Sequence, residues 1–185
     1  MPLQAVTESP ADQPPVELES TFNEHHRLVF QAAHRITGNA ADAEDVLQTV
    51  FTRLLRGGPW PGLADNPGGY LRRSAVNAAL DVIRSKKRAK VISLESGKTE
   101  PTESRPLDPQ ARLEGHELRR RLRQALAKLN QRAAEVFSLR FFEGYDNQEI
   151  ARMLGTSSGT VAVTLNRARN QLKSELREFA GGSIS

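Results

Sequence analysis

The stretch NQEIARMLGTSSGTVAVTLN, residues 147–166, constrains the fold of this chain more than any other. Apolar and small residues recur at three- and four-residue steps on both sides of Gly155, which is typical of two short helices. A glycine at that point supplies the positive φ that a tight turn requires. Three hydroxyl residues can cap the second helix: Thr156, Ser157 and Ser158. The spacing therefore predicts a helix-turn-helix.

The second of these helices is expected to turn Val161 and Leu165 inward and its polar residues outward. Such a surface can donate hydrogen bonds to phosphates and base edges in the major groove of DNA. The candidate DNA-binding residues are Ser158, Gly159, Thr160, Thr164, Arg167 and Arg169. An ordinary helical hairpin inside a bundle is the alternative for this stretch taken alone.

The composition narrows the class of protein. The chain has 185 residues and an excess of 26 − 22 = +4 basic residues, which suits one larger domain or two small ones. Because there is no cysteine, disulfides and thiolate metal sites are excluded. Of the four histidines, His25 and His26 are adjacent and cannot share one helix face, and His34 and His116 stand apart, so neither a metal site nor a cofactor is expected. No set of nucleophile, base and phosphate loop is recognisable, so we expect neither an enzyme nor a small-molecule substrate.

No apolar run approaches the ~20 residues of a membrane span, so no membrane insertion is expected. The N-terminus is acidic and proline-rich, unlike a secretory signal. These features predict a cytoplasmic protein.

The pattern of apolar residues and breakers predicts an all-α protein with two small helical domains joined by a flexible linker. Strict apolar alternation, the signal of a strand, is absent. Thr21, followed by Glu24, is expected to open the first helix as a capping box. The expected parts are a disordered leader (1–20), a first domain (21–90), a linker (91–109), a second domain with the helix-turn-helix (110–179) and a tail (180–185).

The segment from Asp42 to Arg56 has an apolar stripe and an opposite polar face. The outward residues are expected to be Asp42, Glu44, Asp45, Gln48 and Arg53. By itself this pattern favours a solvated face, with the first acids compensating the helix dipole.

The segment from Tyr70 to Arg88 predicts a long helix with Arg73 and Asn77 near a polar face. A buried polar network with Asp81 is an alternative explanation for Asn77. A dense basic group at the end, Arg84, Lys86, Lys87 and Arg88, suggests phosphate contacts beyond what the helix dipole explains. Trp60, on the preceding proline- and glycine-rich loop, either anchors that loop or meets a partner.

Three segments occur in a specific order: DAEDVLQTVF, then NPGGYLRRSAVNAALDVIR, then EVFSLRFFEGYDNQEIARMLGTSSGTVAVTLNRARNQL. Together they resemble the extracytoplasmic-function (ECF) sigma factors of bacterial RNA polymerase. The resemblance covers roughly residues 22–90 and 110–178, nearly all of the chain expected to be ordered.

This resemblance implies a promoter-specificity subunit that binds core RNA polymerase and promoter DNA and is controlled by an anti-sigma factor. It implies that the acidic face of 42–56 binds polymerase, reversing the interpretation from the pattern alone. It places Trp60, Arg73, Asn77 and the basic helix end at the minus-ten element, and the second helix of the helix-turn-helix at the minus-thirty-five element. The alternative function is a stand-alone helix-turn-helix regulator that binds duplex DNA.

Two departures from the family pattern lead to expectations. Asn130, in KLNQRAAEVF, replaces a proline common before the core helix of the second domain, and predicts a looser helix start. Ala162 and Val163 stand where many relatives carry polar residues. Arg167 and Arg169 are then the main basic contacts of the recognition helix.

Overall fold

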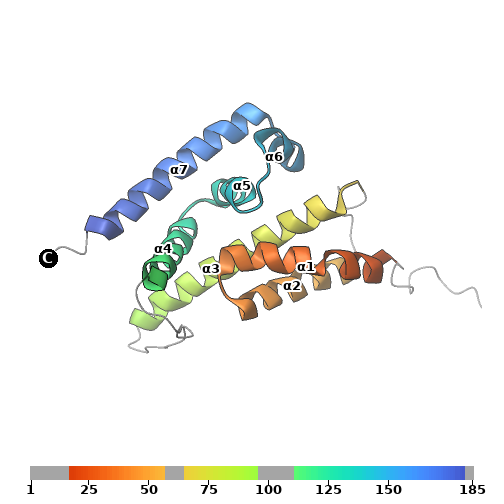
Figure 1. Cartoon of the computed structure of the whole chain (residues 1–185), viewed down its shortest axis with the longest axis horizontal. Helices are drawn as coiled ribbons and strands as arrows, with labels where there is room; N and C mark the ends of the chain where they lie inside the picture. The colour runs from red at the N-terminus through yellow and green to blue at the C-terminus, as the bar shows by residue number, and fades with distance from the viewer. Residues whose placement is uncertain (1–16, 57–64, 96–110, 182–185) are drawn as a thin grey trace, which may run out of the picture.

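The computed structural model describes residues 17–56, 65–95 and 111–181, and within these ranges every regular element is a helix (Figure 1). The helices are α1 (Glu17–Thr37), α2 (Ala40–Leu55), α3 (Pro67–Glu95), α4 (Ala111–Leu126), α5 (Gln131–Phe141), α6 (Asn147–Leu154) and α7 (Ser158–Gly181). The prediction of an all-α chain with two helical domains is confirmed. Among the helices described, none is both long and apolar enough to cross a membrane.

Helices α1, α2 and α3 pack against one another as the N-terminal domain. Gly38 ends α1 with φ +67°, and Asn39 then caps α2 by accepting a hydrogen bond from the Asp42 amide at 3.2 Å. The turn brings the apolar stripes of α1 and α2 together. Fully buried side chains from all three helices form the core, including Val29, Ile36, Val46, Leu71, Val76 and Leu80.

Helices α4 to α7 form the C-terminal domain, and α5 lies at its centre. Asn130 caps α5, because its side chain accepts a hydrogen bond from the Ala133 amide at 2.8 Å. The expectation of a looser helix start at Asn130 was therefore wrong. An asparagine satisfies an orphan amide that a proline at this position would leave to water. The domain core holds Leu126, Val136, Leu139, Ile150 and Val161, all nearly inaccessible.

The helix-turn-helix of α6 and α7 has the predicted turn chemistry. Asp146 and Glu149 form a capping box at the start of α6. Gly155 ends α6 in the left-handed conformation, with φ +60° and ψ +44°. Ser157 caps α7, since its Oγ accepts a hydrogen bond from the Thr160 amide at 3.1 Å. Inward Val161 and Leu165 are buried as predicted.

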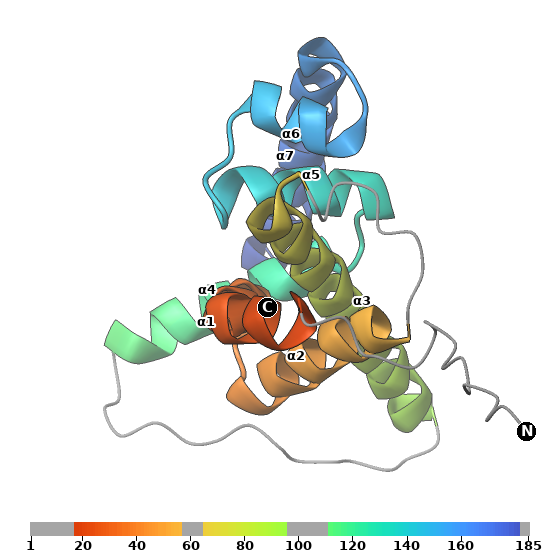
Figure 2. The same ribbon diagram turned by 90° about the vertical axis from the view of Figure 1, so that its right-hand side faces the viewer.

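The two domains lie against each other. Figures 1 and 2 show α5 between α7 on one side and the long α3 on the other. Because α3 is 29 residues long, it serves both as a core helix of the N-terminal domain and as the surface on which the C-terminal domain rests. Helix α4 also contacts α3.

Some predicted boundaries and orientations were wrong. Helix α1 begins at Glu17, so Thr21 lies inside it and not at its cap. Glutamate and leucine before Thr21 are good helix formers, and a polar first turn needs no core beneath it. Helix α3 includes the first five residues of the expected linker and ends at Glu95. The periodicity of apolar residues in 42–56 and 110–129 predicts that Leu55 and Leu118 face inward, but they are 61% and 58% exposed.

Candidate nucleic-acid interface

The first turns of α7 carry an exposed polar surface. Ser158, Gly159 and Thr160 are solvent-exposed at its N-terminus. The Thr164 hydroxyl is partly buried and donates a hydrogen bond to the Thr160 carbonyl at 2.8 Å, so in this state it is engaged with its own helix. A helix start that leaves its residues exposed in this way can enter a groove of duplex DNA.

Arg167 and Arg169 are both exposed, but they point to different sides of α7. Residues two apart on a helix are rotated by about 200°. The Arg169 guanidinium lies over the ring of Phe141 on α5, 6.0 Å from its centroid. Phe141 is itself 51% exposed, so the pair forms part of the outer surface. Among the residues that the structure describes, no aromatic ring supports Arg167 in this way, so the two arginines are not equivalent.

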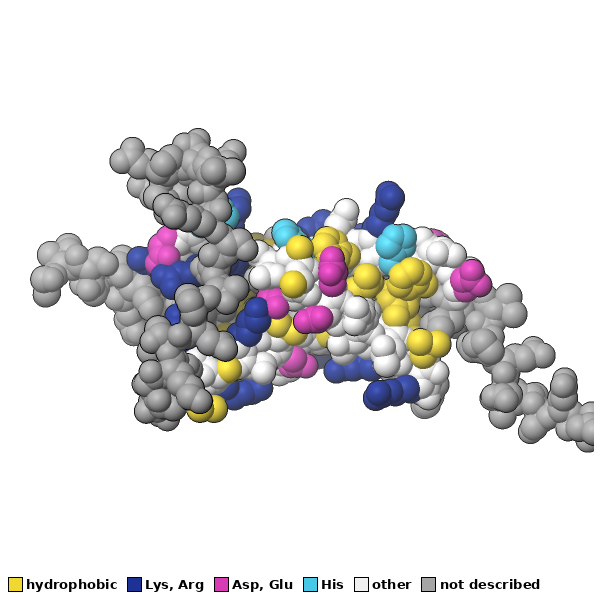
Figure 3. Space-filling view, turned by 90° about the horizontal axis from the view of Figure 1, so that it is seen from below, with side chains coloured by type: hydrophobic (Ala, Val, Ile, Leu, Met, Phe, Trp, Pro, Cys, Tyr) yellow, Lys and Arg dark blue, Asp and Glu magenta, His cyan; other side chains and the backbone are white. Residues whose placement is uncertain are grey.

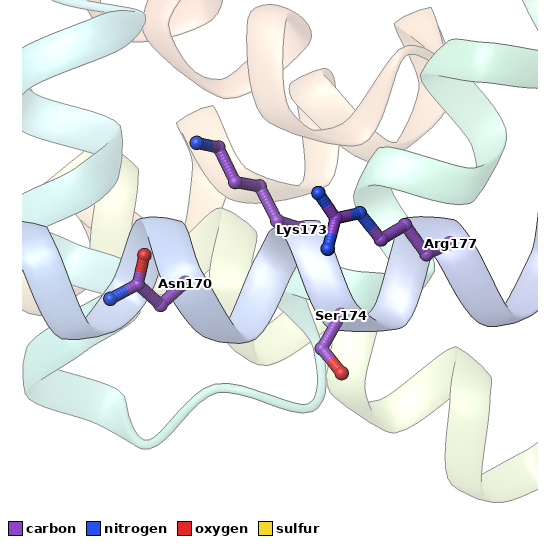
Figure 4. Close-up of a pocket in the computed structure, with 4 residues that line it drawn as sticks. All are labelled: Asn170, Lys173, Ser174 and Arg177. Atoms are coloured by element: carbon purple, nitrogen blue, oxygen red, sulfur yellow. The ribbon is translucent and has the colours of Figure 1, made fainter.

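Two basic residues further along α7 were missed by the sequence analysis. Lys173 and Arg177 follow Arg169 at intervals of four and therefore share its face. Figure 4 shows both in a shallow hollow beside the C-terminal half of α7, which Asn170 and Ser174 also line. The interval of four was visible in the sequence, and it extends the basic surface past the helix-turn-helix.

The polar face of α2 is exposed except at its first acid. Glu44, Asp45, Gln48 and Arg53 are exposed. Asp42 is buried and accepts a hydrogen bond from the Lys86 ammonium at 2.7 Å. The expectation that Asp42 faces outward was wrong, because an α3 lysine covers it. Figure 3, the view from below, shows acidic side chains among apolar ones in the middle of this side, with basic side chains mostly toward its edges.

The polar residues of α3 lie against the C-terminal domain. Arg73 donates from Nε to Glu135 Oε1 at 2.7 Å, and Asn77 donates from Nδ2 to the same oxygen at 2.9 Å. Arg84 donates to the Leu129 carbonyl at 3.2 Å. Asp81 is exposed and lies 3.8 Å from Arg84, so it is not part of a buried network with Asn77.

The basic end of α3 is divided between several environments. Lys86 pairs with Asp42, whereas Arg88 is exposed. Burial lowers the pKa of Lys87, Lys128 lowers it further, and Glu175 partly opposes the change. The basic residues at the end of α3, which were expected to contact phosphates as one group, therefore differ in burial and in their partners. Trp60 lies outside the described residues.

Glu135 was not singled out from the sequence, although its carboxylate accepts the hydrogen bonds of Arg73 and Asn77 between α3 and the C-terminal domain. Its side chain is 5% exposed and also lies 3.5 Å from Arg132. An acid inside the apolar run AAEVF is the one signal that pointed to it, because a buried carboxylate requires partners. The partners on α3 are 58 and 62 residues earlier in the chain.

Comparison with known families matches both domains. Residues 21–89 match the family described as Sigma-70 region 2, and residues 119–172 match Sigma-70, region 4. The first match covers most of α1 to α3, and the second runs from within α4 to Leu172 of α7. Both described domains are therefore accounted for by regions of one family.

Several curated proteins are similar over nearly their whole length. The chain is 32% identical over 163 residues to the RNA polymerase sigma-E factor of Streptomyces avermitilis, covering 87% of this chain and 86% of that protein. It is 29% identical to the ECF RNA polymerase sigma factor SigL of Mycobacterium tuberculosis, with 88% and 90% covered. It is 30% identical to the RNA polymerase sigma factor CarQ of Myxococcus xanthus, with 87% and 90% covered.

Among solved structures, one described as CnrH in complex with the cytosolic domain of CnrY has a similar fold. The TM-score is 0.50 at 21% identity, and the match covers 87% of this chain and 88% of that one. At this identity the similarity concerns the fold.

Proposed function

Because the chain belongs to the ECF group of sigma-70 factors of bacterial RNA polymerase, we propose that α2 binds core polymerase, α3 the minus-ten element and α7 the minus-thirty-five element. Sigma factors direct core polymerase to promoters and initiate transcription. The observation that supports this assignment is that two different exposed surfaces lie on two different helices. One chain presents an exposed acidic face on α2 and an exposed polar helix start on α7.

The proposed polymerase contact is the exposed part of the α2 face. Glu44, Asp45 and Gln48 recur at one-, three- and four-residue steps and lie on one side of the helix. Asp42 is assigned a supporting role, since its carboxylate is already satisfied by Lys86 at 2.7 Å. Arg53 lies near the other end of the same helix and extends the surface.

The proposed minus-ten contact is the polar face of α3, centred on Arg73 and Asn77. A guanidinium and an amide can hydrogen-bond to unpaired base edges and to phosphates of a melted strand. The exposed Arg88 offers a phosphate contact at the far end of the helix. Trp60 precedes α3 in the chain and is proposed to meet a base next to it.

We expect the substitution Arg73→Ala to reduce minus-ten recognition in the assembled polymerase complex. The reason is the loss of a charge-assisted donor, which is worth roughly 1.5–3 kcal/mol. Run-off transcription on a linear promoter and on the same promoter with its minus-ten bases already unpaired separates recognition from melting. Ser85→Ala, an exposed position on the same helix, serves as the control. Equal transcription by both variants would remove Arg73 from the proposed contact.

The proposed minus-thirty-five contact is the N-terminal part of α7, with Arg167 and Arg169 on its two sides. Ser158, Gly159 and Thr160 lie at the helix start, which enters the major groove first. Arg169 shares one face of α7 with Lys173 and Arg177, because the three follow one another at intervals of four residues. That row is proposed to follow a phosphate backbone.

We expect Arg167→Ala to weaken binding to the upstream element by about 1–3 kcal/mol if its guanidinium contacts a base edge. Loss of a phosphate contact would instead weaken binding to all sequences alike. The measurement is the affinity of the polymerase complex for a promoter fragment and for one with the upstream element scrambled. Lys173→Ala is the matched comparison, because Lys173 lies about one turn beyond Arg169 on the row proposed to follow a phosphate backbone, so its loss should weaken binding to both fragments alike.

An anti-sigma factor is the proposed regulator, as the family implies, and the chain is proposed to act in the cytoplasm without a catalytic site of its own. The experiment that tests the function is run-off transcription with core polymerase on genomic fragments, with the start sites mapped. Defined starts that require the chain are the expected result. Tight operator binding without any association with polymerase would instead identify a stand-alone regulator.

A further inference from the structure

One stripe of α7 faces directly away from the core of its domain and carries no charge. Four buried apolar residues define the inward side of the helix: Val161, Leu165, Ala168 and Leu172. Val163 lies two residues from both Val161 and Leu165, a rotation of about 200°, so it points outward. Other exposed residues follow the same stripe at intervals of three or four. We call Gly159, Val163, Asn166 and Asn170 the outward crest.

The crest begins with small side chains, so another molecule can approach the helix backbone closely there. A Cβ atom on Gly159 would meet only Ser157 Oγ, at 3.8 Å. Val163 is 52% exposed. Because its side chain carries only methyl groups, it cannot bind a phosphate and favours an apolar partner.

Asn166 and Asn170 add amide groups to the crest. Asn170 Nδ2 donates a long hydrogen bond to Asn166 Oδ1, at 3.5 Å. This contact uses one of the two lone pairs of the oxygen and neither N–H of the Asn166 amide. Asn166 can therefore both donate a hydrogen bond to a single partner and accept one from it.

Positive charges flank the crest on both sides. On one side, Arg140 and Arg169 line a shallow hollow that Asn166 also borders. The Arg140 guanidinium is held there, because it donates a hydrogen bond to the Tyr145 carbonyl at 3.0 Å. On the other side of the crest, Arg167 is exposed. The uncharged stripe therefore runs between two groups of cations.

This distribution of charge matches the major groove of B-form DNA. The groove is about 12 Å wide, and a helix with its side chains is about 10–12 Å across. When a helix lies in the groove, base edges face its inserted side and the two phosphate backbones lie along its flanks. The crest is placed to meet bases, and the flanking arginines are placed to meet phosphates.

The chemistry of the crest favours A·T base pairs. In the major groove thymine presents its 5-methyl group, and adenine presents an acceptor at N7 and a donor at N6. The methyl groups of Val163 can bury the thymine methyl, whereas they would leave the amino group of a cytosine without a partner. The amide of Asn166 matches the adenine edge, because it donates and accepts side by side.

We propose that Val163 and Asn166 determine the sequence preference at the minus-thirty-five element by reading A·T base pairs. Val163 contacts the methyl group of a thymine, and Asn166 pairs with the N6 and N7 edge of an adenine. The inference rests on the proposed role of α7 at this element. The two uncharged residues supply specificity, whereas Arg140 and Arg169 hold the phosphate backbone and supply affinity.

The test for Val163 uses the full chain assembled with core polymerase and promoter fragments located from mapped start sites. Each thymine of the upstream element is replaced in turn by deoxyuridine, which lacks only the methyl group. One replacement should raise the Kd of the wild-type complex roughly fourfold, the usual effect of one buried methyl group. Val163→Ala should raise the Kd for the unmodified fragment by a similar factor. It should no longer respond to that replacement, because the two groups act as a pair.

The test for Asn166 replaces each adenine of the element in turn by 7-deazaadenine, which lacks the N7 acceptor. One replacement should raise the Kd of the wild-type complex about tenfold, within the range of a bidentate contact between an amide and adenine. The Kd of Asn166→Ala should not respond to the replacement at that position. Val91→Ala is the matched control for Val163→Ala, because Val91 is 49% exposed near the end of α3. It should bind every fragment as the wild type does.

The outcomes separate this inference from the proposed function. A penalty from one modified base that disappears in the matching alanine variant supports the assignment of that residue. A penalty that persists in the variant, or no penalty at any thymine or adenine, overturns it. Weakening by Val163→Ala that is equal on scrambled DNA also overturns it, since Val163 would then contact polymerase. Failure of the proposed function would appear in the wild type, as equal affinity for fragments with intact and scrambled elements.

Discussion

Reversal of charge by Asp45→Lys is expected to weaken binding to core RNA polymerase by about 3 kcal/mol, or roughly a hundredfold in Kd. Asp45 is exposed on the proposed polymerase-binding face of α2, beside Glu44. A lysine there removes an attraction and places like charges together at the same interface, which costs several kcal/mol when the surface is desolvated. Titration of labelled chain with purified core polymerase measures the effect.

The control for Asp45→Lys is the same reversal at Glu24, which lies on α1 and has a side chain that is 75% exposed. It changes the net charge identically and should leave the Kd within a few-fold, because a distant exposed charge is screened by salt. Equal weakening by both variants would mean that polymerase responds to overall charge. The specific role of α2 would then be abandoned.

Truncation of Leu139 to alanine is expected to destabilise the C-terminal domain by about 2–5 kcal/mol, the usual cost of removing a fully buried leucine. Leu139 lies on α5 and is inaccessible to solvent. A loss of this size approaches the whole stability of a small domain. Urea unfolding followed by circular dichroism should show an earlier transition, and transcription from promoters that need the upstream element should fall with it.

Leu118→Ala is the matched comparison, since the substitution is identical and the domain is the same. Leu118 is 58% exposed, so its truncation removes little buried apolar surface. The free energy of unfolding should therefore change by less than about 1 kcal/mol. Similar losses from the two truncations would show that α5 is not the centre of the domain core.

The features predicted well from the sequence were those fixed by neighbouring residues. Gly155 adopts the left-handed turn, and Val161 and Leu165 face inward, because the helical period and the turn chemistry act over a few residues. The start of α1 was misplaced because two local signals conflict there. A convincing local cap at Thr21 competes with helix-forming residues before it, and only the structure shows which prevails.

Apart from the basic residues Lys173 and Arg177, the features missed were those that depend on residues far apart in the chain. A helical pattern shows that Arg73 and Asn77 share a polar side, but it does not show what faces them. Glu135 is separated from its two partners on α3 by 58 and 62 residues. The burial of Asp42 beneath Lys86 was hidden likewise, because it follows from how α2 crosses α3. Such pairings become visible only once the helices are packed.

The double use of Arg73 has a consequence for changing the promoter preference of this protein. Its guanidinium contacts Glu135 and the Met153 carbonyl of the C-terminal domain, so a residue chosen to suit another minus-ten sequence also alters the contact between the domains. Substitutions at Arg73 and Glu135 should therefore be strongly non-additive in a double-mutant cycle. The hydrogen bonds described for Thr160 stay within the start of α7, and a side chain at Gly159 would meet only Ser157 Oγ, which makes this helix start the more tractable place to engineer specificity.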